Sequence, residues 1–374
     1  MATIYLTGYK NSNLGDDLFF VTVLKRYPKE HFIFEDISSG YYAGLFKDFD
    51  NVDVIPSIQD SYIQRIINRI KRITGCNIRE QYYSSYRRSN TIKADVYLKI
   101  GGSVFIQPEK DVRAVKDQFL SDHFYFGGIP FFYIGCNFGP FSSPDYFKNA
   151  EYVVRNCDGI CFRDSYSYNL FKHLKNVRLA PDVLFGARNV IPYENKINNS
   201  IGISLIDISS RKSLASYSMS YLESISSFLR SQNNNYDLIR LFSFCEPEGD
   251  GIAIREVLAQ LPARIKSKIE VVTYNNNLSL FLTKFSEMES LIATRFHAMI
   301  LGFVFGIKTT PIVYSKKITH ALNDLDQKVS AINLNDLNVE ALIDSVSCSK
   351  IIDVDKQINS SQDQFIDFES YLNL

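Results

Sequence analysis

The sequence lacks the patterns that usually mark a metal site, although it contains six cysteines. No two cysteines have Cys-X-X-Cys spacing, and Cys157 and Cys161, which are close in the sequence, have no histidine beside them. Structural zinc needs such a cluster of thiolate and imidazole ligands, so a zinc site is not expected. We predict reduced and mostly buried thiols instead.

The sequence also lacks a net charge, a membrane-spanning run and a signal peptide. Positive and negative side chains balance at 41 each, so no overall field would draw the chain to nucleic acid or lipid. No apolar run is long enough to cross a bilayer, and the first residues have neither the charged nor the apolar region of a secretory signal. These absences predict a cytoplasmic protein that does not bind nucleic acid.

Tryptophan is absent too, whereas 23 tyrosines and 28 phenylalanines are present and would suit surfaces that stack on sugars. The chain has 374 residues, of which 45% are hydrophobic and 22% charged. This is the composition of an ordinary folded protein, and the length favours two domains over one.

Short apolar runs alternate with longer helical patterns along most of the chain. The runs expected to form strands are residues 4–7, 32–34, 96–100, 131–135, 159–162, 201–205, 238–242, 269–272, 291–293 and 311–314. Strands that alternate with helices form parallel, doubly wound sheets. A polar stretch at 189–200 interrupts the pattern and is interpreted as a linker. We therefore predict an α/β protein with two Rossmann-like domains that face a cleft, at 1–190 and 200–350. Residues 351–374 are expected to form a helix that packs back on the first domain.

The most informative segment carries Arg295 and His297 between the predicted strand that ends at Ala293 and a predicted buried helix that closes at Gly306. In open α/β sheets, ligands bind where a strand ends and a helix begins, because the first N–H groups of the helix are unpaired there. A histidine on an apolar helix is usually a packed core residue. Its place in the first helical turn, two positions from an arginine, favours a functional role here.

Two further cations follow predicted strands. Arg163 follows the strand at 159–162, where it would pair with a carboxylate or bind an anion. Lys317 follows the strand at 311–314, where it would be solvated or contact a phosphate. Together with Arg295 and His297, these side chains are expected in one cleft. Three cations and a titratable ring indicate a small anion with several charges, such as one that carries a phosphate and a carboxylate.

The segment Asn13 to Asp17 follows the first strand and opens a helix, but it is not a Gly-X-Gly-X-X-Gly motif. Its two carboxylates either stabilise the helix N-terminus, or Asp16 faces the cleft and accepts a proton from a substrate hydroxyl. Gly101 and Gly102, which follow another strand, form a tight turn or let the backbone approach a ligand.

In this order, these motifs resemble those of the polysaccharide pyruvyl transferase family. The segments that carry the resemblance are Asn13–Asp17, the glycine loop at Gly101, Ile134–Pro140, Arg163–Ser165, Leu179–Asp182, Arg295–Ala298 and Tyr314–Lys317. The chain departs from the family at Ser103, where a third glycine is usual, and at Phe296, where leucine is usual.

The resemblance implies a GT-B-like fold and an enzyme of bacterial surface polysaccharide biosynthesis, such as that of capsule or exopolysaccharide. It would transfer the pyruvyl group of phosphoenolpyruvate, a co-substrate, to two hydroxyls of a glycan sugar as a cyclic ketal and release phosphate. No metal or cofactor is expected, because the cations already supply the charge. The site residues would be His297 as general acid, Asp16 at the sugar hydroxyl, Arg163, Arg295 and Lys317 at the phosphate and carboxylate, and Asn13, Asp17, Gly101 and Gly102 as further substrate-binding residues.

Residues 61–93 carry eight Lys or Arg and one acidic residue, with isoleucines on one helical face. One interpretation is a sheet-covering helix with a solvated basic side. The other is a surface that contacts anionic lipid at the inner membrane face, or the diphosphate of a lipid-linked sugar acceptor.

Two other functions compete with pyruvyl transfer. A GT-B glycosyltransferase would place the same cations on a nucleotide sugar, although none of the three Asp-X-Asp triplets clearly follows a buried strand. A non-catalytic module that binds anionic glycans would use the aromatics and the cations. Such a module does not explain why His297 and Asp16 stand at two separate strand–helix corners.

Overall fold

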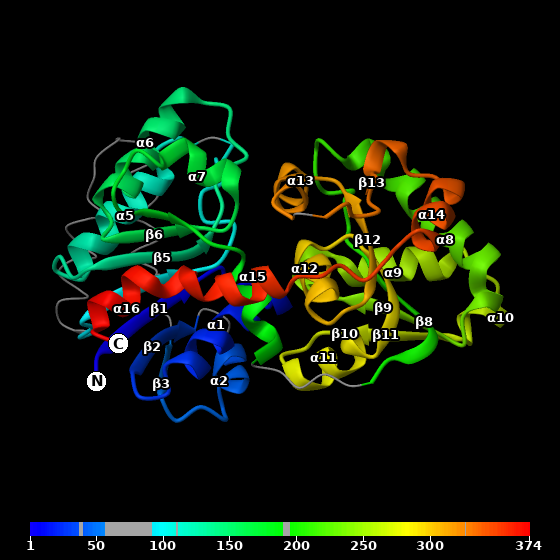
Figure 1. Ribbon diagram of the computed structural model, residues 1–374, viewed down its shortest axis with the longest axis horizontal. Coiled ribbons are helices and arrows are strands. Elements are labelled where there is room, and N and C mark those ends of the chain that lie inside the picture. Colours follow the sequence, from blue (N-terminus) through cyan, green and yellow to red (C-terminus); the bar gives the residue numbers. More distant parts are fainter. Residues whose placement is uncertain (37–39, 57–91, 110, 190–194, 326) are drawn as a thin grey trace, which may run out of the picture.

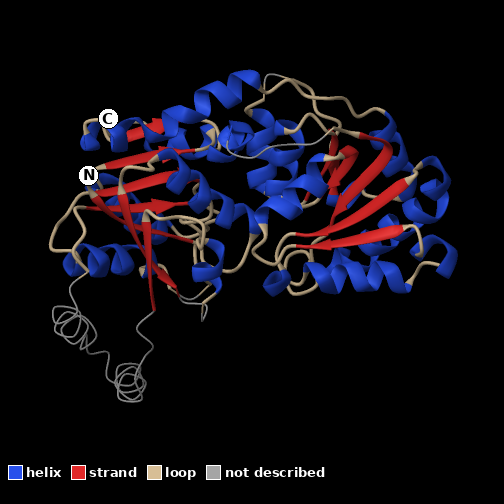
Figure 2. Ribbon diagram, turned by 90° about the horizontal axis from the view of Figure 1, so that it is seen from below, coloured by secondary structure: helices blue, strands red, loops and turns tan. Residues whose placement is uncertain are grey.

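The computed structural model describes residues 1–36, 40–56, 92–109, 111–189, 195–325 and 327–374. It contains two α/β domains that lie side by side (Figure 1), each built on a sheet with helices on both faces (Figure 2). Most of the basic segment at 61–93 lies outside the described residues, so its contact with lipid or acceptor stays a prediction. In the described part of the chain, no helix has the length and apolar character needed to cross a membrane.

The amino-terminal domain contains a parallel sheet of seven strands in the order β3-β2-β1-β4-β5-β6-β7. The strands are β1 (Thr3–Gly8), β2 (His31–Asp36), β3 (Val52–Pro56), β4 (Val96–Ile100), β5 (Phe131–Cys136), β6 (Gly159–Phe162) and β7 (Val177–Leu179). The two edge strands, β3 and β7, were not expected, because all but one of their residues are exposed or only half-buried and they do not form an apolar run. The inner strands β5 and β6 are buried throughout, as a parallel sheet covered on both faces requires.

Helices cover both faces of this sheet. They are α1 (Leu14–Arg26), α2 (Tyr41–Leu45), α5 (Ala114–Tyr125), α6 (Pro144–Asn156), α7 (Ser165–Phe171) and the 3-10 helix η1 (Val183–Asn189). Polar residues start several of them. Asn13 caps α1 by accepting from the Gly15 amide at 3.0 Å, and Asp164 caps α7 by accepting from the Ser167 amide at 2.8 Å.

The carboxyl-terminal domain contains six parallel strands in the order β10-β9-β8-β11-β12-β13. The strands are β8 (Ile197–Ser204), β9 (Leu238–Ser243), β10 (Ile269–Thr273), β11 (Met288–Ala293), β12 (Lys308–Val313) and β13 (Ile332–Asn333). β8 begins inside the stretch interpreted as a linker. Its first three residues are exposed and polar in part, so the sequence pattern concealed the start of the strand.

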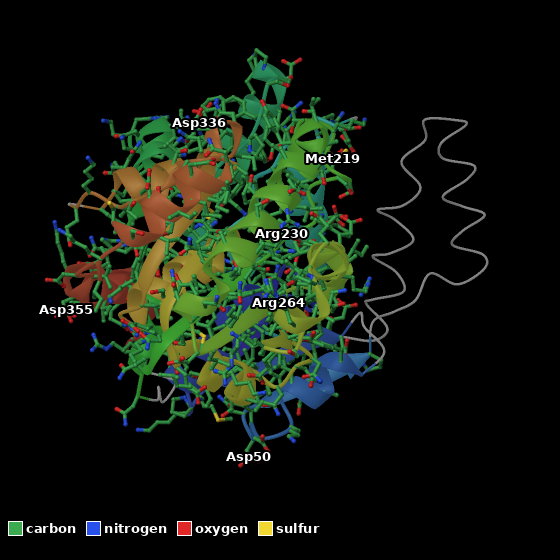
Figure 3. The ribbon with its side chains drawn as sticks, turned by 90° about the vertical axis from the view of Figure 1, so that its right-hand side faces the viewer. Asp50, Met219, Arg230, Arg264, Asp336 and Asp355 are labelled. Carbon is green, nitrogen blue, oxygen red and sulfur yellow. The ribbon has the colours of Figure 1, made fainter. Side chains whose placement is uncertain are left out.

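The helices of this domain include the site helix α12 and several amphipathic helices. They are α8 (Ser218–Gln232), α9 (Asp250–Ala259), α10 (Ala263–Lys266), α11 (Leu278–Ser286), α12 (Phe296–Val304), α13 (Lys316–Asn323), α14 (Val339–Ser347) and the 3-10 turns η2 (Ala215–Tyr217), η3 (Asn233–Asn235), η4 (Glu246–Glu248) and η5 (Leu334–Asp336). Charged side chains such as Arg230 of α8 and Arg264 of α10 lie at the surface (Figure 3).

The carboxyl-terminal segment returns to the first domain, where it is drawn in red in Figure 1. It comprises α15 (Asp355–Ser360), the 3-10 helix η6 (Ser361–Phe365) and α16 (Ile366–Leu372). Gln364 accepts from the Gly135 amide at 2.8 Å and donates to the Ala180 carbonyl at 2.7 Å. Glu369 pairs with Arg26 of α1 at 2.7 Å. These contacts hold the carboxyl-terminal segment against the amino-terminal domain.

One large cluster of buried apolar residues runs through the domain interface. It joins Phe19 of α1 and Val183 of η1 to Phe296 and Ile300 of α12. The domains are therefore docked through a shared core. The five cysteines in the described residues are free thiols, and four of them are buried, which confirms the prediction for those five.

Candidate active site

A cavity of about 330 Å³ lies between the two domains. It is lined by seven residues that the sequence predicted for the site: Asn13, Asp16, Gly102 and Arg163 from the first domain, and Arg295, His297 and Lys317 from the second. These residues stand at the carboxyl ends of β1, β4, β6, β11 and β12, or directly after them. Parallel strands bring such ends to one edge of a sheet, and the two edges face each other here.

Two predicted substrate-binding residues do not line the cavity. Asp17 is fully buried, and its carboxylate accepts hydrogen bonds from two tyrosine hydroxyls. Gly101 has a left-handed backbone, with φ of 122°, and a Cβ there would lie 3.6 Å from Asp16 Oδ1. Gly101 therefore shapes the turn beside Asp16. Sequence spacing does not tell which neighbour in a turn faces the cavity, and substrate binding by these two residues stays a prediction.

Arg163 reaches the cavity from the end of β6, but its guanidinium is already engaged. Nη1 pairs with Asp182 Oδ2 at 2.7 Å, and Nη2 donates to Asn137 Oδ1 at 2.7 Å. Its side chain packs on the ring of Phe296, with 4.3 Å from Cζ to the ring centroid. A Cβ at Gly102 would lie 2.3 Å from that Cζ, so the missing side chain at Gly102 makes room for the arginine.

Arg295 forms the N-cap of α12, and it too is held by carboxylates. Its Nε donates to Asp250 at 3.0 and 3.1 Å, Nη2 pairs with Asp250, and Nη1 pairs with Glu248. Asp250 is fully buried and also accepts from the backbone amides of Phe244 and Cys245, at 2.9 and 3.0 Å. The charge count made from the sequence therefore needs correction, because two of its three cations have carboxylate partners inside the protein.

Lys317, in the first turn of α13, is the cation available to a ligand. Among the described residues it has no ion-pair partner, and it lies beside the ring of Phe296 in the cavity wall. Burial lowers the pKa of Lys317, and the nearby Arg163, Arg211 and Arg295 lower it further. An anion in the cavity would relieve this repulsion, so the site favours negative charge.

His297 lies in the first turn of α12 and is enclosed by both domains. Its ring packs edge-on against Phe19 of α1 at 5.4 Å between centroids, and a Cβ at Gly15 would lie only 1.6 Å from Nδ1. Nε2 is shut off from solvent and has no hydrogen-bond partner among the described residues. Buried polar atoms are nearly always paired in folded proteins, so an unpaired imidazole nitrogen at the wall of the cavity marks His297 as a candidate functional residue.

The protonation of His297 differs from the sequence-based expectation. Burial lowers its pKa well below the usual value, and Arg163, Lys317 and Arg295 add to the effect. The imidazole is therefore neutral at neutral pH. An unperturbed imidazole has a pKa of about 6.5, and this value does not apply inside a cluster of cations.

Asp16 faces the cavity from the first turn of α1. Burial and the neighbouring Asp17 raise its pKa to about 8, although Lys317 and Arg163 oppose the shift. At neutral pH most Asp16 side chains therefore carry a proton. A neutral carboxyl can both accept and donate a hydrogen bond, which suits the orientation of a sugar hydroxyl better than its deprotonation.

Further residues that line the cavity were not predicted as site residues, and three of them, Glu248, Tyr314 and Arg211, affect its charge. Glu248 follows β9, as Arg295 follows β11. A search for charged residues after each predicted strand could therefore have found Glu248. Tyr314 follows β12; burial alone would raise its pKa, but Lys317, Arg211 and Arg295 bring it below the usual value. Arg211 stands in the irregular loop after β8, 3.6 Å from Glu248, and no pattern in the sequence marks it. In the described part of the chain, no cluster of His, Cys, Asp or Glu is arranged to hold a metal ion.

A family described as polysaccharide pyruvyl transferase has a sequence model that matches residues 13–316. The chain belongs to the polysaccharide pyruvyl transferase family. The match covers most of the chain and every predicted site residue except Lys317, which lies one position beyond it. This transferase is therefore an enzyme of polysaccharide biosynthesis. A comparison with curated proteins finds no match by sequence.

Solved structures resemble the transferase over its full length. UDP-GlcNAc 2-epimerase from Neisseria meningitidis, bound to UDP-GlcNAc, has 10% identity and a TM-score of 0.61, with 100% of both chains covered. MnaA from S. aureus, solved with UDP, has 12% identity and a TM-score of 0.62, with 100% of this chain and 98% of the other covered. TarM has 9% identity and a TM-score of 0.51, covering 100% and 98%. At such identities the likeness shows the GT-B fold alone.

Substitution of Gly15 in the transferase by alanine should lower the free energy of unfolding by about 1–3 kcal/mol, because the new Cβ would overlap the imidazole of His297. The expected loss is notable, since alanine is otherwise favoured in helices. Urea denaturation measures it. Gly44→Ala in α2 is the matched control, because its Cβ would meet only the end of the Asn276 side chain at 3.1 Å. Equal stability of the two variants would mean that Gly15 does not support His297.

Proposed function

We propose that this enzyme transfers the pyruvyl group of phosphoenolpyruvate to two hydroxyls of a glycan sugar as a cyclic ketal, with release of phosphate. The observation that carries the proposal is the convergence of His297, Lys317, Arg295 and Arg163 on one cavity between the domains. An anion with a phosphate and a carboxylate would pair with Lys317 and take hydrogen bonds from the arginines. Membership of the family supports the same reaction.

The reaction forms two C–O bonds and breaks one. A proton adds to the methylene carbon of phosphoenolpyruvate while the first sugar hydroxyl adds to the neighbouring carbon. The bond from that carbon to the phosphate oxygen then breaks, and the second hydroxyl takes its place. Of the two hydroxyl protons, one replaces the proton given to the methylene carbon and the other leaves with hydrogen phosphate. The site therefore needs a single group that donates a proton and recovers it.

His297 would be that group. In the empty site it is neutral, because burial and the surrounding cations lower its pKa. A substrate with several negative charges would raise this pKa, so binding of phosphoenolpyruvate and protonation of His297 would be coupled. The enzyme would then hold an acid only when the substrate is present.

The other residues would bind and orient. Lys317, the first N–H groups of α12 and the remaining N–H groups of Arg163 and Arg295 would contact the phosphate and carboxylate and stabilise the leaving group. Asp16, protonated at neutral pH because burial raises its pKa to about 8, would orient the acceptor hydroxyl. A lipid-linked acceptor at the inner membrane face remains part of the proposal.

The test is incubation of the enzyme with phosphoenolpyruvate and acceptors that carry galactose, mannose or hexosamine. We expect release of phosphate together with an acceptor mass increase of one pyruvyl ketal, and formation of both products about 10²–10⁴-fold more slowly with His297→Asn. A thermal-shift comparison separates the alternative glycosyltransferase function, since only phosphoenolpyruvate should raise the melting temperature. Stabilisation by a nucleotide sugar, with no ketal formed, would contradict the proposal.

A further inference from the structure

Asp17 lies next to Asp16 in the sequence but takes part in a different structure. Its Oδ2 accepts a hydrogen bond from Tyr41 Oη at 2.6 Å and another from Tyr274 Oη at 2.7 Å. Tyr41 belongs to α2 of the first domain, whereas Tyr274 follows β10 of the second domain. A single carboxylate oxygen thus joins the two domains.

The charge of Asp17 depends strongly on these two hydrogen bonds. Asp17 is fully buried, and none of the described residues forms an ion pair with it. Burial raises its pKa to about 6, while the hydrogen bonds from Tyr41 and Tyr274 oppose the rise, so the group is mostly ionised at neutral pH. Hydrogen bonds to a buried ionised group are among the stronger ones in proteins. Separation of the domains would remove one of these donors.

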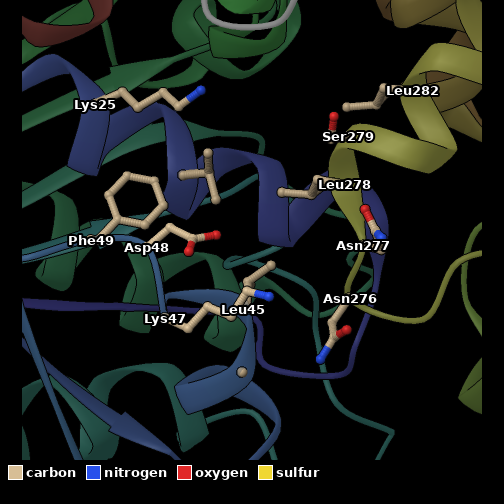
Figure 4. Close-up of a pocket in the computed structure, with 12 residues that line it drawn as sticks. Lys25, Leu45, Lys47, Asp48, Phe49, Asn276, Asn277, Leu278, Ser279 and Leu282 are labelled. Atoms are coloured by element: carbon tan, nitrogen blue, oxygen red, sulfur yellow. The ribbon is translucent and has the colours of Figure 1, made fainter.

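The same turn of α1 touches the second domain at further points. The Leu14 amide donates to the Phe244 carbonyl at 3.1 Å, and Gly15 packs against His297. About one helical turn further along α1, the two domains are separated by a second cavity. Val21 of α1 and Asn276 of the second domain both line this cavity, of about 430 Å³, between the domains (Figure 4). The contact made by Asp17 therefore lies between two interdomain cavities.

The active-site cavity depends on this docking. Asp16 comes from the first domain, while His297 and Lys317 come from the second. These groups share one cavity only while the first turn of α1 is held against the second domain.

We propose that Asp17 is a positioning residue, whose hydrogen bond from Tyr274 docks the two domains and thereby keeps Asp16 in one cavity with His297 and Lys317. The catalytic part of this inference rests on the proposed function, whereas the docking part does not.

The test compares two substitutions that each remove one donor from the same oxygen. Tyr274→Phe removes the donor across the domains, and Tyr41→Phe removes the donor within the first domain. Hydrogen exchange of the Leu14 amide, in the free protein, reports the opening of the interface, because this amide donates across it. We expect roughly 10–100-fold faster exchange in Tyr274→Phe, the equivalent of one hydrogen bond to a charged group, and less than about threefold in Tyr41→Phe.

Kinetics supply a second readout that general destabilisation would not produce. Tyr274→Phe should lower kcat roughly tenfold and leave KM for phosphoenolpyruvate within about threefold, because Lys317, Arg295 and the first N–H groups of α12, which supply all the proposed contacts except that of Arg163, belong to the second domain. Equal Leu14 exchange in the two variants would overturn the docking role, whatever reaction the enzyme catalyses. Faster exchange in Tyr274→Phe with unchanged kcat would overturn the positioning of Asp16. Absence of pyruvyl transfer in the wild-type enzyme would overturn the proposed function and leave the exchange result valid.

Discussion

Replacement of Arg295 by alanine is expected to lower the free energy of unfolding by about 3–5 kcal/mol. The guanidinium binds Asp250 and Glu248, and Asp250 is fully buried, so the substitution leaves an unpaired charge in the interior. Loss of phosphoenolpyruvate affinity should follow mainly from this disruption. Urea denaturation followed by circular dichroism measures the change. From the sequence, Arg295 was expected mainly to hold the substrate.

A double variant distinguishes the buried charge from simple loss of packing. Asp250→Asn keeps a side-chain oxygen for the backbone amides of Phe244 and Cys245 but removes the charge. Arg295→Met combined with Asp250→Asn should therefore recover a large part of the stability lost in Arg295→Met alone. A loss below about 1 kcal/mol in Arg295→Ala would show that the ion pair does not hold the corner at which α12 begins.

Replacement of His297 by asparagine is expected to reduce turnover by about 10²–10⁴-fold, the usual contribution of a general acid, with phosphoenolpyruvate affinity within several-fold. The pKa of His297 is depressed in the empty site, and a bound trianion would raise it. The complex therefore binds one more proton than the free enzyme, so affinity should increase as the pH falls toward the depressed pKa. Calorimetry in buffers of different ionisation enthalpy counts this proton.

His320 provides the matched control for the proton count. It stacks on Tyr166 at 4.2 Å between centroids and does not line the active-site cavity. His320→Asn should keep both the turnover and the proton uptake near pH 7, whereas His297→Asn should lose both. Asp16 could take up a proton only at higher pH, since its pKa is about 8. Proton uptake that persists in His297→Asn at pH 7 would remove the general-acid role.

We call the expectation that ligand-binding residues directly follow buried strands the strand-end rule. It located much of the candidate site because each strand–helix unit of the fold repeats the same geometry. Arg163, Arg295 and Lys317 were each predicted to follow a buried strand, and all three line one cavity. Parallel strands deliver their carboxyl ends to a common edge, so the position of a residue along the chain also gives its place in the domain. Apolar runs marked the inner strands for the same reason, whereas the edge strands β3 and β7 have too few buried residues to produce a run.

The strand-end rule could not predict the hydrogen-bond and ion-pair partners of these residues, because the partners come from distant parts of the chain. Asp182 lies 19 residues from Arg163, and Asp250 lies 45 residues from Arg295. The separate roles of Asp16 and Asp17 also depend on distant residues, since Tyr274 is 257 positions from Asp17. No spacing within the motif could predict that one carboxyl would face the cavity and the other would join the domains.

The sequence by itself determined the two α/β domains, the family and the charged residues at the strand ends. These features depend on patterns among neighbouring residues of the chain. Only the tertiary structure decided the state of those charges. Folding within each domain paired Arg163 and Arg295 with carboxylates and left Lys317 without one among the described residues, whereas burial between the docked domains raised the pKa of Asp16 and lowered that of His297. The physical reason is that burial and Coulomb interactions depend on distances between side chains, and folding sets these distances independently of separation along the chain.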